Sequence, residues 1–401
     1  MISESQPVII AGAGPAGCTI ALYLARRGIP VVLLEAEPEL PLDLRASTFH
    51  PPTLDMLEGL GLTERLLSLG LVSPTYQYRD RRTGEAAVFD LGLLADATNH
   101  PYRLQCEQYK LTQLAVEMLR ALPVARVLFD HRVEQVEQAD ERVLVHCETP
   151  ASGFVSFAGS YLIGADGANS RVRKSQCIDF EGFTYPERFL VVSTPFDFTR
   201  ALPRLSNVNY VSDPEEWCVL LRTPSLWRVL VPTDPAASEE ELLSEAFIQQ
   251  RLHRIVAKRG AYLIEHRTLY RVHQRVARHY CRGRVLLVGD AAHINNPLGG
   301  MGMNGGLHDA FSLAEKLAQL HEGVGGIDLL GLYERQRRGI CVRFIQEHTI
   351  RNKHLLEERD PRRQAQRHEE FMRIAADPEL ARAFLLRTSM IQSLRDAAAI
   401  H

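Results

Sequence analysis

Residues Gly12, Gly14 and Gly17 have a spacing that suits recognition of a phosphate-bearing ligand by the backbone. They lie in PVIIAGAGPAG, where a short apolar run leads into the pattern G-x-G-x-x-G. The first glycine allows a tight turn, the second lets a pyrophosphate approach the main chain, and the third lets helix and strand pack closely. Pro15 and Ala16 complete the turn, and the helix that follows supplies free N–H groups. The stretch predicts a dinucleotide site, for either NAD or FAD.

The residues after this turn strengthen the prediction. CTIALYLARRG reads as a helix that ends at Gly28, and IPVVLLE reads as a second buried strand that ends at Glu35. The order strand, glycine turn, helix, strand and acidic residue is typical of the dinucleotide-binding unit. A carboxylate at the end of the second strand accepts hydrogen bonds from ribose hydroxyls. We expect this role for Glu35.

In two later stretches an apolar strand again runs into a turn that contains glycine and an acidic residue. Residues 161–173 read YLIGADGANSRVR, an apolar strand that runs into Asp166 and a basic turn. Residues 289–310 read GDAAHINNPLGGMGMNGGLHDA and follow the apolar strand RVLLV. The motifs GAGPAG…E, ADGANSRVR and GDAAH…P…GGMGMNGGLHDA, in this order, resemble the single-component, FAD-dependent aromatic hydroxylases built on the p-hydroxybenzoate hydroxylase fold. The resemblance spans about residues 7–350.

The resemblance implies FAD as the bound cofactor. It assigns the ribityl chain to Asp290, the pyrophosphate to Arg45, and the ribityl–phosphate portion to Gln105. The glycine loop is expected to lie against the isoalloxazine ring, and the helix LHDAFSLAEKL, which begins after the loop, is expected to direct its positive end at the ring. The expected cofactor-binding residues are Gly12, Gly14, Pro15, Ala16, Gly17, Glu35, Arg45, Gln105, Asp166, Asp290, Gly300, Gly302, Met303 and Asn304.

The reaction implied by the resemblance is aromatic hydroxylation. NAD(P)H reduces FAD, O2 then forms a C4a-hydroperoxyflavin, and this species hydroxylates a small aromatic or heteroaromatic acid or phenol. Outside the glycine loop that the resemblance assigns to the isoalloxazine ring, no second G-x-G-x-x-G occurs for the reductant, which is expected to bind transiently. The acidic EAEPEL after the second strand favours NADH over NADPH, because it would repel a 2′-phosphate. No metal is expected, since no H-x-x-x-H spacing appears.

The substrate is expected to lie against a sheet from the middle of the chain. Residues 189–233 read as four strands, and residues 75–91 read as a hairpin that joins them. Arg222 and Arg228, in neighbouring strands, are either a bidentate anchor for a substrate carboxylate or exposed sheet arginines.

Two further residues are candidates for contact with the reacting ring. His50 follows Arg45 in a segment that enters the active site of relatives. It is either the base that takes a phenolic proton or a histidine beside the cofactor. The carbonyl of Pro297 lies near the hydroxylated position in relatives, whereas His293 is expected to hold the loop.

These elements predict an α/β protein in which a Rossmann-like FAD-binding domain is interleaved with a mixed β-sheet substrate domain and followed by a helical C-terminal tail. The expected segments are 1–74, 99–180 and 268–327 for the FAD-binding domain, 75–98 and 181–267 for the substrate domain, and 328–401 for the tail. The same fold leaves two alternatives open, which are an oxygenase of larger natural products (epoxidase, Baeyer–Villiger or N-oxygenase) and a flavin-binding regulator without turnover.

Composition and net charge further limit the class of protein to which this chain can belong. The 401 residues carry a net charge of −3 and are 45% hydrophobic, which is ordinary for a globular protein and argues against nucleic-acid binding. Seven scattered cysteines show no metal or redox spacing and fit a reducing cytoplasm. No membrane span is expected. The expected partners are a small aromatic substrate and O2, with the chain a monomer or a homodimer.

Overall fold

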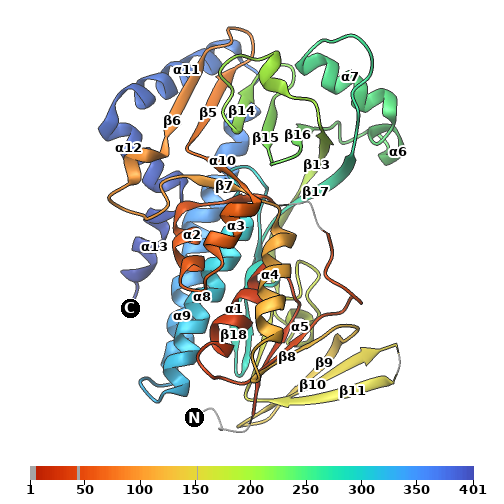
Figure 1. Cartoon of the computed structure of the whole chain (residues 1–401), viewed down its shortest axis with the longest axis vertical. Helices are drawn as coiled ribbons and strands as arrows, with labels where there is room; N and C mark the ends of the chain where they lie inside the picture. Colours follow the sequence, from red (N-terminus) through yellow and green to blue (C-terminus); the bar gives the residue numbers. More distant parts are fainter. Residues whose placement is uncertain (1–5, 43–45, 151) are drawn as a thin grey trace.

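The computed structural model describes residues 6–42, 46–150 and 152–401. Its lower half in Figure 1 is built on a six-stranded sheet in the order β18-β19-β12-β1-β2-β8. All neighbours are parallel except β18 and β19. The strands are β1 (Val8–Ala11), β2 (Val31–Leu34), β8 (Ala125–Leu128), β12 (Tyr161–Gly164), β18 (Cys281–Arg282) and β19 (Val285–Leu287). Segments far apart in the sequence therefore meet in one sheet, as the three motifs predicted.

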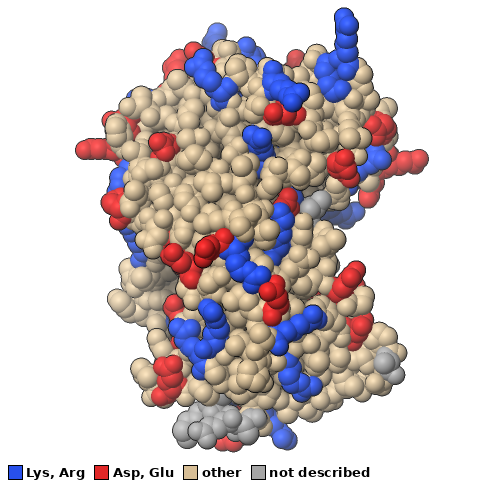
Figure 2. Space-filling model, in the orientation of Figure 1, with Lys and Arg blue, Asp and Glu red and all other residues tan. Residues whose placement is uncertain are grey.

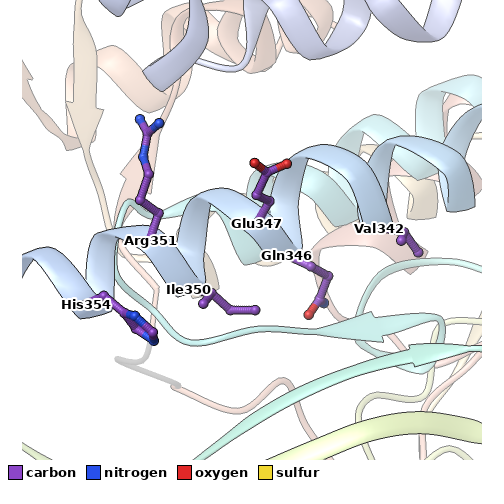
Figure 3. Close-up of a pocket in the computed structure, with 6 residues that line it drawn as sticks. All are labelled: Val342, Gln346, Glu347, Ile350, Arg351 and His354. Carbon is purple, nitrogen blue, oxygen red and sulfur yellow. The ribbon is translucent and has the colours of Figure 1, made fainter.

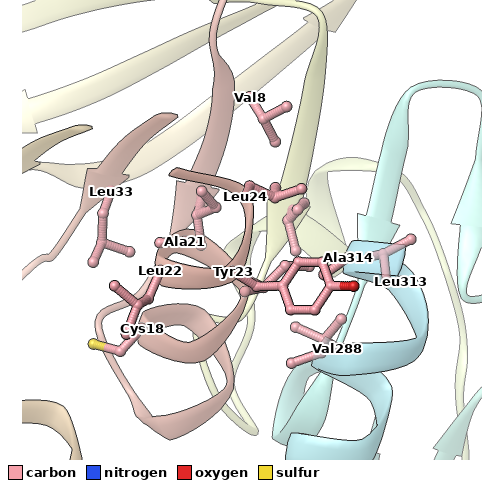
Figure 4. Packing of buried hydrophobic residues seen from close by; sticks show 14 of the residues in the cluster. Val8, Cys18, Ala21, Leu22, Tyr23, Leu24, Leu33, Val288, Leu313 and Ala314 are labelled. Carbon is pink, nitrogen blue, oxygen red and sulfur yellow. The ribbon is translucent and has the colours of Figure 1, made fainter. Parts of the chain in front are cut away.

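Helix α1 (Pro15–Ala25) is the central packing element of this half. Its residues from Gly17 to Ala25 are all buried, because the helix lies between the sheet and α8 (Met301–His321). Figure 4 shows α1 side chains such as Leu22 packed among residues from β1, β2 and α8. The ring of Tyr23 meets Phe311 of α8 edge to face at 5.9 Å. Burial on several sides explains why the run is apolar throughout.

The upper half contains an eight-stranded sheet in the order β20-β17-β13-β16-β15-β14-β5-β6. Only β14 and β5 pair in parallel. The predicted hairpin is confirmed as β5 and β6, and the four predicted strands are β13 to β16. The strands are β5 (Thr75–Asp80), β6 (Ala86–Asp90), β13 (Phe180–Thr194), β14 (Val208–Ser212), β15 (Cys218–Arg222), β16 (Trp227–Pro232), β17 (His266–Ala277) and β20 (His293–Ile294).

The remaining strands form two three-stranded sheets. One contains β3 (Thr48–Phe49), β7 (Arg103–Gln105) and β4 (Leu71–Ser73), and the other contains β9 (Arg132–Gln138), β10 (Val143–Thr149) and β11 (Gly153–Gly159). The long strand β17 crosses the predicted boundary at residue 268 and pairs with β13 along most of its length. The division of the chain into segments therefore stays a proposal.

The remaining helices cover the sheets and form the predicted helical tail. They are α2 (Pro51–Glu58), α3 (Thr63–Leu69), α4 (Gln108–Arg120), α5 (Arg171–Ser175), α6 (Glu239–Leu242), α7 (Glu245–Ile255), α9 (Asp328–Ile340), α10 (Glu347–Leu356), α11 (Pro361–Ala376), α12 (Pro378–Thr388) and α13 (Ile391–Ala398). Shorter turns are the 3₁₀ helices η1 (Leu91–Leu94), η2 (Phe198–Arg200) and η3 (Gly289–Ala291) and the π-helix η4 (Cys341–Gln346). No helix in these residues combines the length and hydropathy that a bilayer crossing requires. On the face in Figure 2, basic and acidic side chains are interspersed.

The predicted start of the helix after the glycine stretch was wrong. We expected it at Leu307, but α8 begins at Met301, so Gly302, Gly305 and Gly306 belong to its first turns. A Cβ on Gly306 would lie 2.9 Å from the Cα of Gly289, which is closer than side chains tolerate. The helix thus needs glycine for close packing on the turn after β19, whereas Gly289, Gly299 and Gly300 of this stretch have positive φ, which favours glycine.

Candidate active site

One cavity, of about 470 Å³, joins the two halves of the described structure. Its lining includes Gly14, Pro15, Ala16, Asp290, Pro297, Gly300, Gly302, Met303 and Arg228 among the predicted site residues. Eight other predicted residues lie outside the lining. They are Gly12, Gly17, Glu35, His50, Gln105, Asp166, Arg222 and Asn304. Arg45 lies outside the described residues, so its predicted role stays a prediction.

The glycine turn after β1 forms one end of the cavity. A Cβ on Gly17 would lie 2.0 Å from the carbonyl oxygen of Gly12, and a Cβ on Gly12 would lie 2.5 Å from the carbonyl oxygen of Ala165. A Cβ on Gly14 would meet no atom within 4 Å, because this glycine faces the cavity. The carboxylate of Glu35 accepts a hydrogen bond from the backbone N–H of Ala13 at 2.7 Å. Backbone therefore packs closely against Gly12 and Gly17, whereas Gly14 leaves the turn open to the cavity.

The ADG motif builds the wall beside this turn. The carboxylate of Asp166 accepts from the Ser170 hydroxyl at 2.5 Å and from the backbone N–H groups of Arg171 and Val172. Burial raises the pKa of the Asp166 carboxyl. Arg173 donates to the carbonyl oxygens of Ala168 and Ala291 at 2.8 Å each. These contacts tie the second motif to the third.

A buried ion cluster, which the sequence did not reveal, holds the third motif. Asp309 of α8 accepts from His293 Nε2 and from Arg337 Nε, each at 2.7 Å, and all three side chains are at most 2% exposed. Arg337 also donates to the carbonyl oxygen of Gly305 at 3.3 Å. Despite burial, His293 and Arg337 hold the pKa of Asp309 below its usual range. Burial disfavours the His293 imidazolium, but Asp309 and the neighbouring Cys341 raise the pKa of His293 well above its usual range.

The cluster positions α8 rather than touching the cavity. His293 therefore has the loop-holding role that its place in the motif predicted. The missed residue Asp309 had one signal in the sequence, an acidic residue in the largely apolar run LHDAFSLA, whereas Arg337 lies in the charged run YERQRRG and had none. Charged residues at such positions are buried only when they are paired.

His50 is completely buried behind the glycine stretch. Its Nε2 donates to the carbonyl oxygen of Gly299 at 2.9 Å, and its backbone N–H donates to the side-chain oxygen of Asn304 at 2.9 Å. Burial, with the charge of Arg103 as the next cause, holds the pKa of His50 well below its usual range. Such a histidine is neutral and a weak base near pH 7. Its role as catalytic base stays a prediction, and the geometry favours a role in holding the Gly299 turn.

Asn304 and Gln105 connect the same region to the small β3-β7-β4 sheet. The Asn304 amide donates to the carbonyl oxygens of Thr48 and Gly300 at 2.8 and 2.7 Å. Gln105 accepts from the Thr48 hydroxyl at 3.0 Å, while its buried Nε2 has no hydrogen-bond partner among the described residues. An unpaired buried donor beside a cavity-lining residue fits the predicted contact of Gln105 with a cofactor.

The other end of the cavity lies against the eight-stranded sheet. Its wall there is mostly apolar and includes Val191, Tyr210, Val219, Leu221, Leu230, Tyr270, Val272 and Leu298. The same wall also carries the buried Arg228, together with Arg271 and His273 of β17. Arg228 is 3% exposed. Burial would raise the pKa of the Glu107 carboxyl, but Lys110, a backbone hydrogen bond and the charge of Arg228 together lower it. An apolar chamber with one buried cation suits a small aromatic ligand that carries a polar substituent.

The predicted pairing of Arg222 with Arg228 is not supported by the strand register. Arg222 is opposite Trp227, and Arg228 is opposite Leu221. Because successive residues of a strand face opposite sides, the two arginines project from different faces of the sheet. Arg228 shares the cavity face with Leu221, whereas Arg222 lies 5.9 Å from the ring of Trp227 on the other face. One carboxylate cannot be held by both.

A second hollow is a shallow depression along η4 and α10. Figure 3 shows its lining on successive turns of the helix, with Ile350, Gln346 and His354 on one side and Glu347 and Arg351 on the other. Its lining includes none of the three motifs. The chemistry of this chain is therefore concentrated in the first cavity.

The first cavity has the features that FAD requires. The helices α1 and α8 both begin at it, each with a glycine N-cap and no side-chain cap. Uncapped N–H groups and the positive ends of the dipoles favour a pyrophosphate at one helix and negative charge on a flavin at the other. Gly14 leaves room for the backbone approach, and Gln105 offers an unpaired donor. The residues present thus fit the cofactor that the motifs predict.

Comparison with known proteins agrees with this fit. A family described as "FAD binding domain" matches residues 5–348. Para-nitrophenol 4-monooxygenase of Pseudomonas sp. strain WBC-3 is 34% identical over 97% of this chain and 96% of its own length. The 6-hydroxy-3-succinoylpyridine 3-monooxygenase HspB of Pseudomonas putida is 36% identical over 86% of this chain and 87% of its own. The crystal structure of p-nitrophenol 4-monooxygenase PnpA from Pseudomonas putida DLL-E4 superposes with a TM-score of 0.91 at 33% identity, covering 97% of this chain and 98% of that one.

The fold, the three motifs and the cavity define a flavoprotein oxidoreductase. The chain belongs to the FAD binding domain family and, within it, to the FAD-dependent aromatic hydroxylases. It is an FAD-dependent monooxygenase, as the motifs predicted.

Proposed function

We propose that this chain hydroxylates a small phenol or hydroxylated pyridine that carries a polar substituent away from the ring hydroxyl. The supporting observation is the apolar chamber with the buried Arg228, which opens directly onto the glycine stretch of the cofactor end. The similarity to monooxygenases of para-nitrophenol and of a hydroxylated pyridine supports the same substrate class. Bound FAD supplies the redox chemistry that consumes NAD(P)H and O2.

The chain's own residues bind and orient the substrate in this proposal. Val219, Leu221 and Leu230 exclude water from the ring, and Arg228 contacts the polar substituent. The carbonyl oxygen of Pro297 accepts from the Gly300 N–H at 3.0 Å and keeps a second lone pair for the substrate hydroxyl. Backbone N–H groups at Gly302 and Met303 contact the flavin, and Asp290 contacts the ribityl chain.

The proposal is tested with purified protein and a panel of para-nitrophenol, 4-hydroxybenzoate and hydroxypyridines. We expect a yellow protein whose NADH oxidation rises several-fold with one of these compounds and yields a hydroxylated product. NADH consumption that is equal with and without every compound would exclude this substrate class. It would favour the larger substrates of the alternative hypothesis. A flavoprotein that consumes neither NADH nor NADPH with any compound would favour the regulator.

We further propose NADH as the reductant, because the acidic segment EAEPEL after β2 would disfavour a 2′-phosphate near this part of the surface. A ratio of kcat/KM values that favours NADPH would overturn this choice. A cytoplasmic location is proposed from the seven cysteines, which are all free thiols. The oligomeric state is proposed to be a monomer or a homodimer, and sedimentation velocity distinguishes them.

A further inference from the structure

A stack of three aromatic rings leads from the substrate end of the cavity to the C-terminal tail. Tyr210 of β14 lines the cavity, and its ring stacks on Tyr78 of β5 with centroids 5.0 Å apart and planes at 22°. The other face of Tyr78 meets Phe371 of α11, with centroids 4.2 Å apart and planes at 4°. Tyr210 and Tyr78 are opposite each other in the β14–β5 register, so the stack runs along the cavity face of the sheet and ends at a residue 161 positions further along the chain than Tyr210.

The tail helices are held in place around this stack. Phe384 of α12 lies edge to face with Tyr78 at 6.3 Å. The hydroxyls of Tyr76 and Thr388 are 2.8 Å apart, and Arg382 forms an ion pair with Asp96 at 2.6 Å. In Figure 1, α11 and α12 lie beside β5 and β6. These contacts dock the tail against β5 and β6, on the same face of the sheet as the cavity.

The stack ends in a part of the chain that the family match does not include. That match stops at residue 348, and α11 and α12 begin after it. The element that supports the cavity wall is therefore separate from the elements that bind the cofactor. A change in the tail can alter the substrate end while the glycine turn after β1 is unaffected.

We propose that Phe371 is a positioning residue that sets the shape of the substrate end of the cavity through Tyr78 and Tyr210. The inference rests on the proposed function, in that this end of the cavity receives the aromatic substrate. Removal of the Phe371 ring leaves one face of Tyr78 without packing. Tyr78 then has space to turn away, and Tyr210 loses the surface that fixes its rotamer. A substrate ring held against Tyr210 would bind more loosely.

The test compares Phe371→Ala with Phe371→Tyr, which keeps the ring, and with Met372→Ala, a matched control at a neighbouring residue that is 40% exposed. Para-nitrophenol is titrated into each FAD-loaded protein, and the change in flavin absorbance gives its Kd. We expect Phe371→Ala to raise this Kd five- to tenfold and to divert more NADH into hydrogen peroxide. Phe371→Tyr and Met372→Ala should remain within twofold of the parent, and the Kd for FAD should be unchanged throughout.

A merely structural role of Phe371 gives a different result. Phe371→Ala would then lower the melting temperature while the folded, FAD-loaded protein kept the parent Kd and the parent coupling of NADH to product, and this outcome would overturn the inference. If the parent binds neither para-nitrophenol nor the other phenols of the panel, the proposed substrate class fails first. A crystal structure of Phe371→Ala still decides the inference in that case, because Tyr210 in its parent rotamer contradicts it and a displaced ring supports it.

Discussion

The two ends of the cavity are built on different principles. At the cofactor end the surface is mostly backbone, and glycine positions set how closely a ligand approaches. At the substrate end the surface is side chains of a sheet, supported by rings from the tail. Backbone recognition depends on local spacing, whereas side-chain recognition depends on which strands meet and in which register. The cofactor end is therefore expected to tolerate very few substitutions, and the substrate end to tune specificity.

The largest effect is expected from Gly17→Ala. The new Cβ would lie 2.0 Å from the carbonyl oxygen of Gly12, and backbone cannot move out of the way cheaply. We expect FAD affinity to fall by more than about 100-fold, measured by titration of FAD into the apoprotein.

Gly14→Ala is the matched comparison, since its Cβ meets no protein atom within 4 Å. This variant should fold with nearly the parent melting temperature but bind FAD more weakly, because the methyl group points into the cavity. Parent-like FAD affinity in both variants would show that the backbone does not set the approach at this end.

The next largest effect is expected from Asp309→Asn. Removing this charge leaves Arg337 buried without its ion-pair partner, and breaking a buried pair costs about 3–5 kcal/mol of unfolding free energy. Denaturant unfolding of the holoprotein measures the loss. The double variant Asp309→Leu, Arg337→Met should recover part of it, because the buried Arg337 charge is removed and His293, without Asp309, can lose its proton. Equal stability of parent and Asp309→Asn would contradict the role of the cluster.

The sequence predicted the cofactor end well because its signals are local. The spacing of Gly12, Gly14 and Gly17 and the carboxylate of Glu35 lie within one strand–turn–helix–strand unit, and the structure has β1, α1 and β2 there. Local apolar runs before turn residues likewise predicted β1, β2, β12 and β19 of the six-stranded sheet, whereas the fold class followed from the resemblance carried by the three motifs. The start of α8 was missed because glycine disfavours helix, whereas tertiary packing of Gly306 on Gly289 overrides that preference.

The substrate end depends on information that a single sequence shows poorly. The opposite faces of Arg222 and Arg228 follow from the four residues between β15 and β16, and a fixed loop length was needed to derive them. The contact of Tyr78 with Phe371 joins residues that no periodicity links. The pairing of Asp309 with His293 and Arg337 likewise depends on how α8 and α9 pack. These features become visible only when distant segments are placed together.

The substrate end itself is tested by Arg228→Gln. A hydrogen bond to a charged group contributes about 1.5–3 kcal/mol, so substrate Kd should rise by about 10- to 100-fold. Arg222→Gln is the matched control, because it removes the same charge from the other face of the sheet. Its substrate Kd should stay within twofold. Similar increases in both variants would point to long-range charge rather than contact, and no increase in either would exclude an anchor on this strand pair.

The smallest effect concerns acid stability and the histidines behind the cofactor end. Burial lowers the pKa of His308 to about 3, so the folded state stays neutral at this position while the unfolded chain takes up a proton below its ordinary pKa of 6.5. The contribution of His308 to stability is therefore complete above pH 6.5 and declines as the pH falls toward 3. One proton corresponds to about 1.4 kcal/mol per pH unit.

His308→Gln should flatten the slope of unfolding free energy against pH by this amount between pH 6 and 4, as measured by urea unfolding. His354→Gln, at an exposed position on α10, controls for the loss of a histidine and should leave the slope unchanged. His50, whose pKa is also lowered by burial, adds to the same slope, so the variant retains part of it. A slope in His308→Gln equal to that of the parent would mean that acid reaches His308 without unfolding. The cofactor end of the cavity would then be more accessible to water than the burial of His308 and His50 indicates.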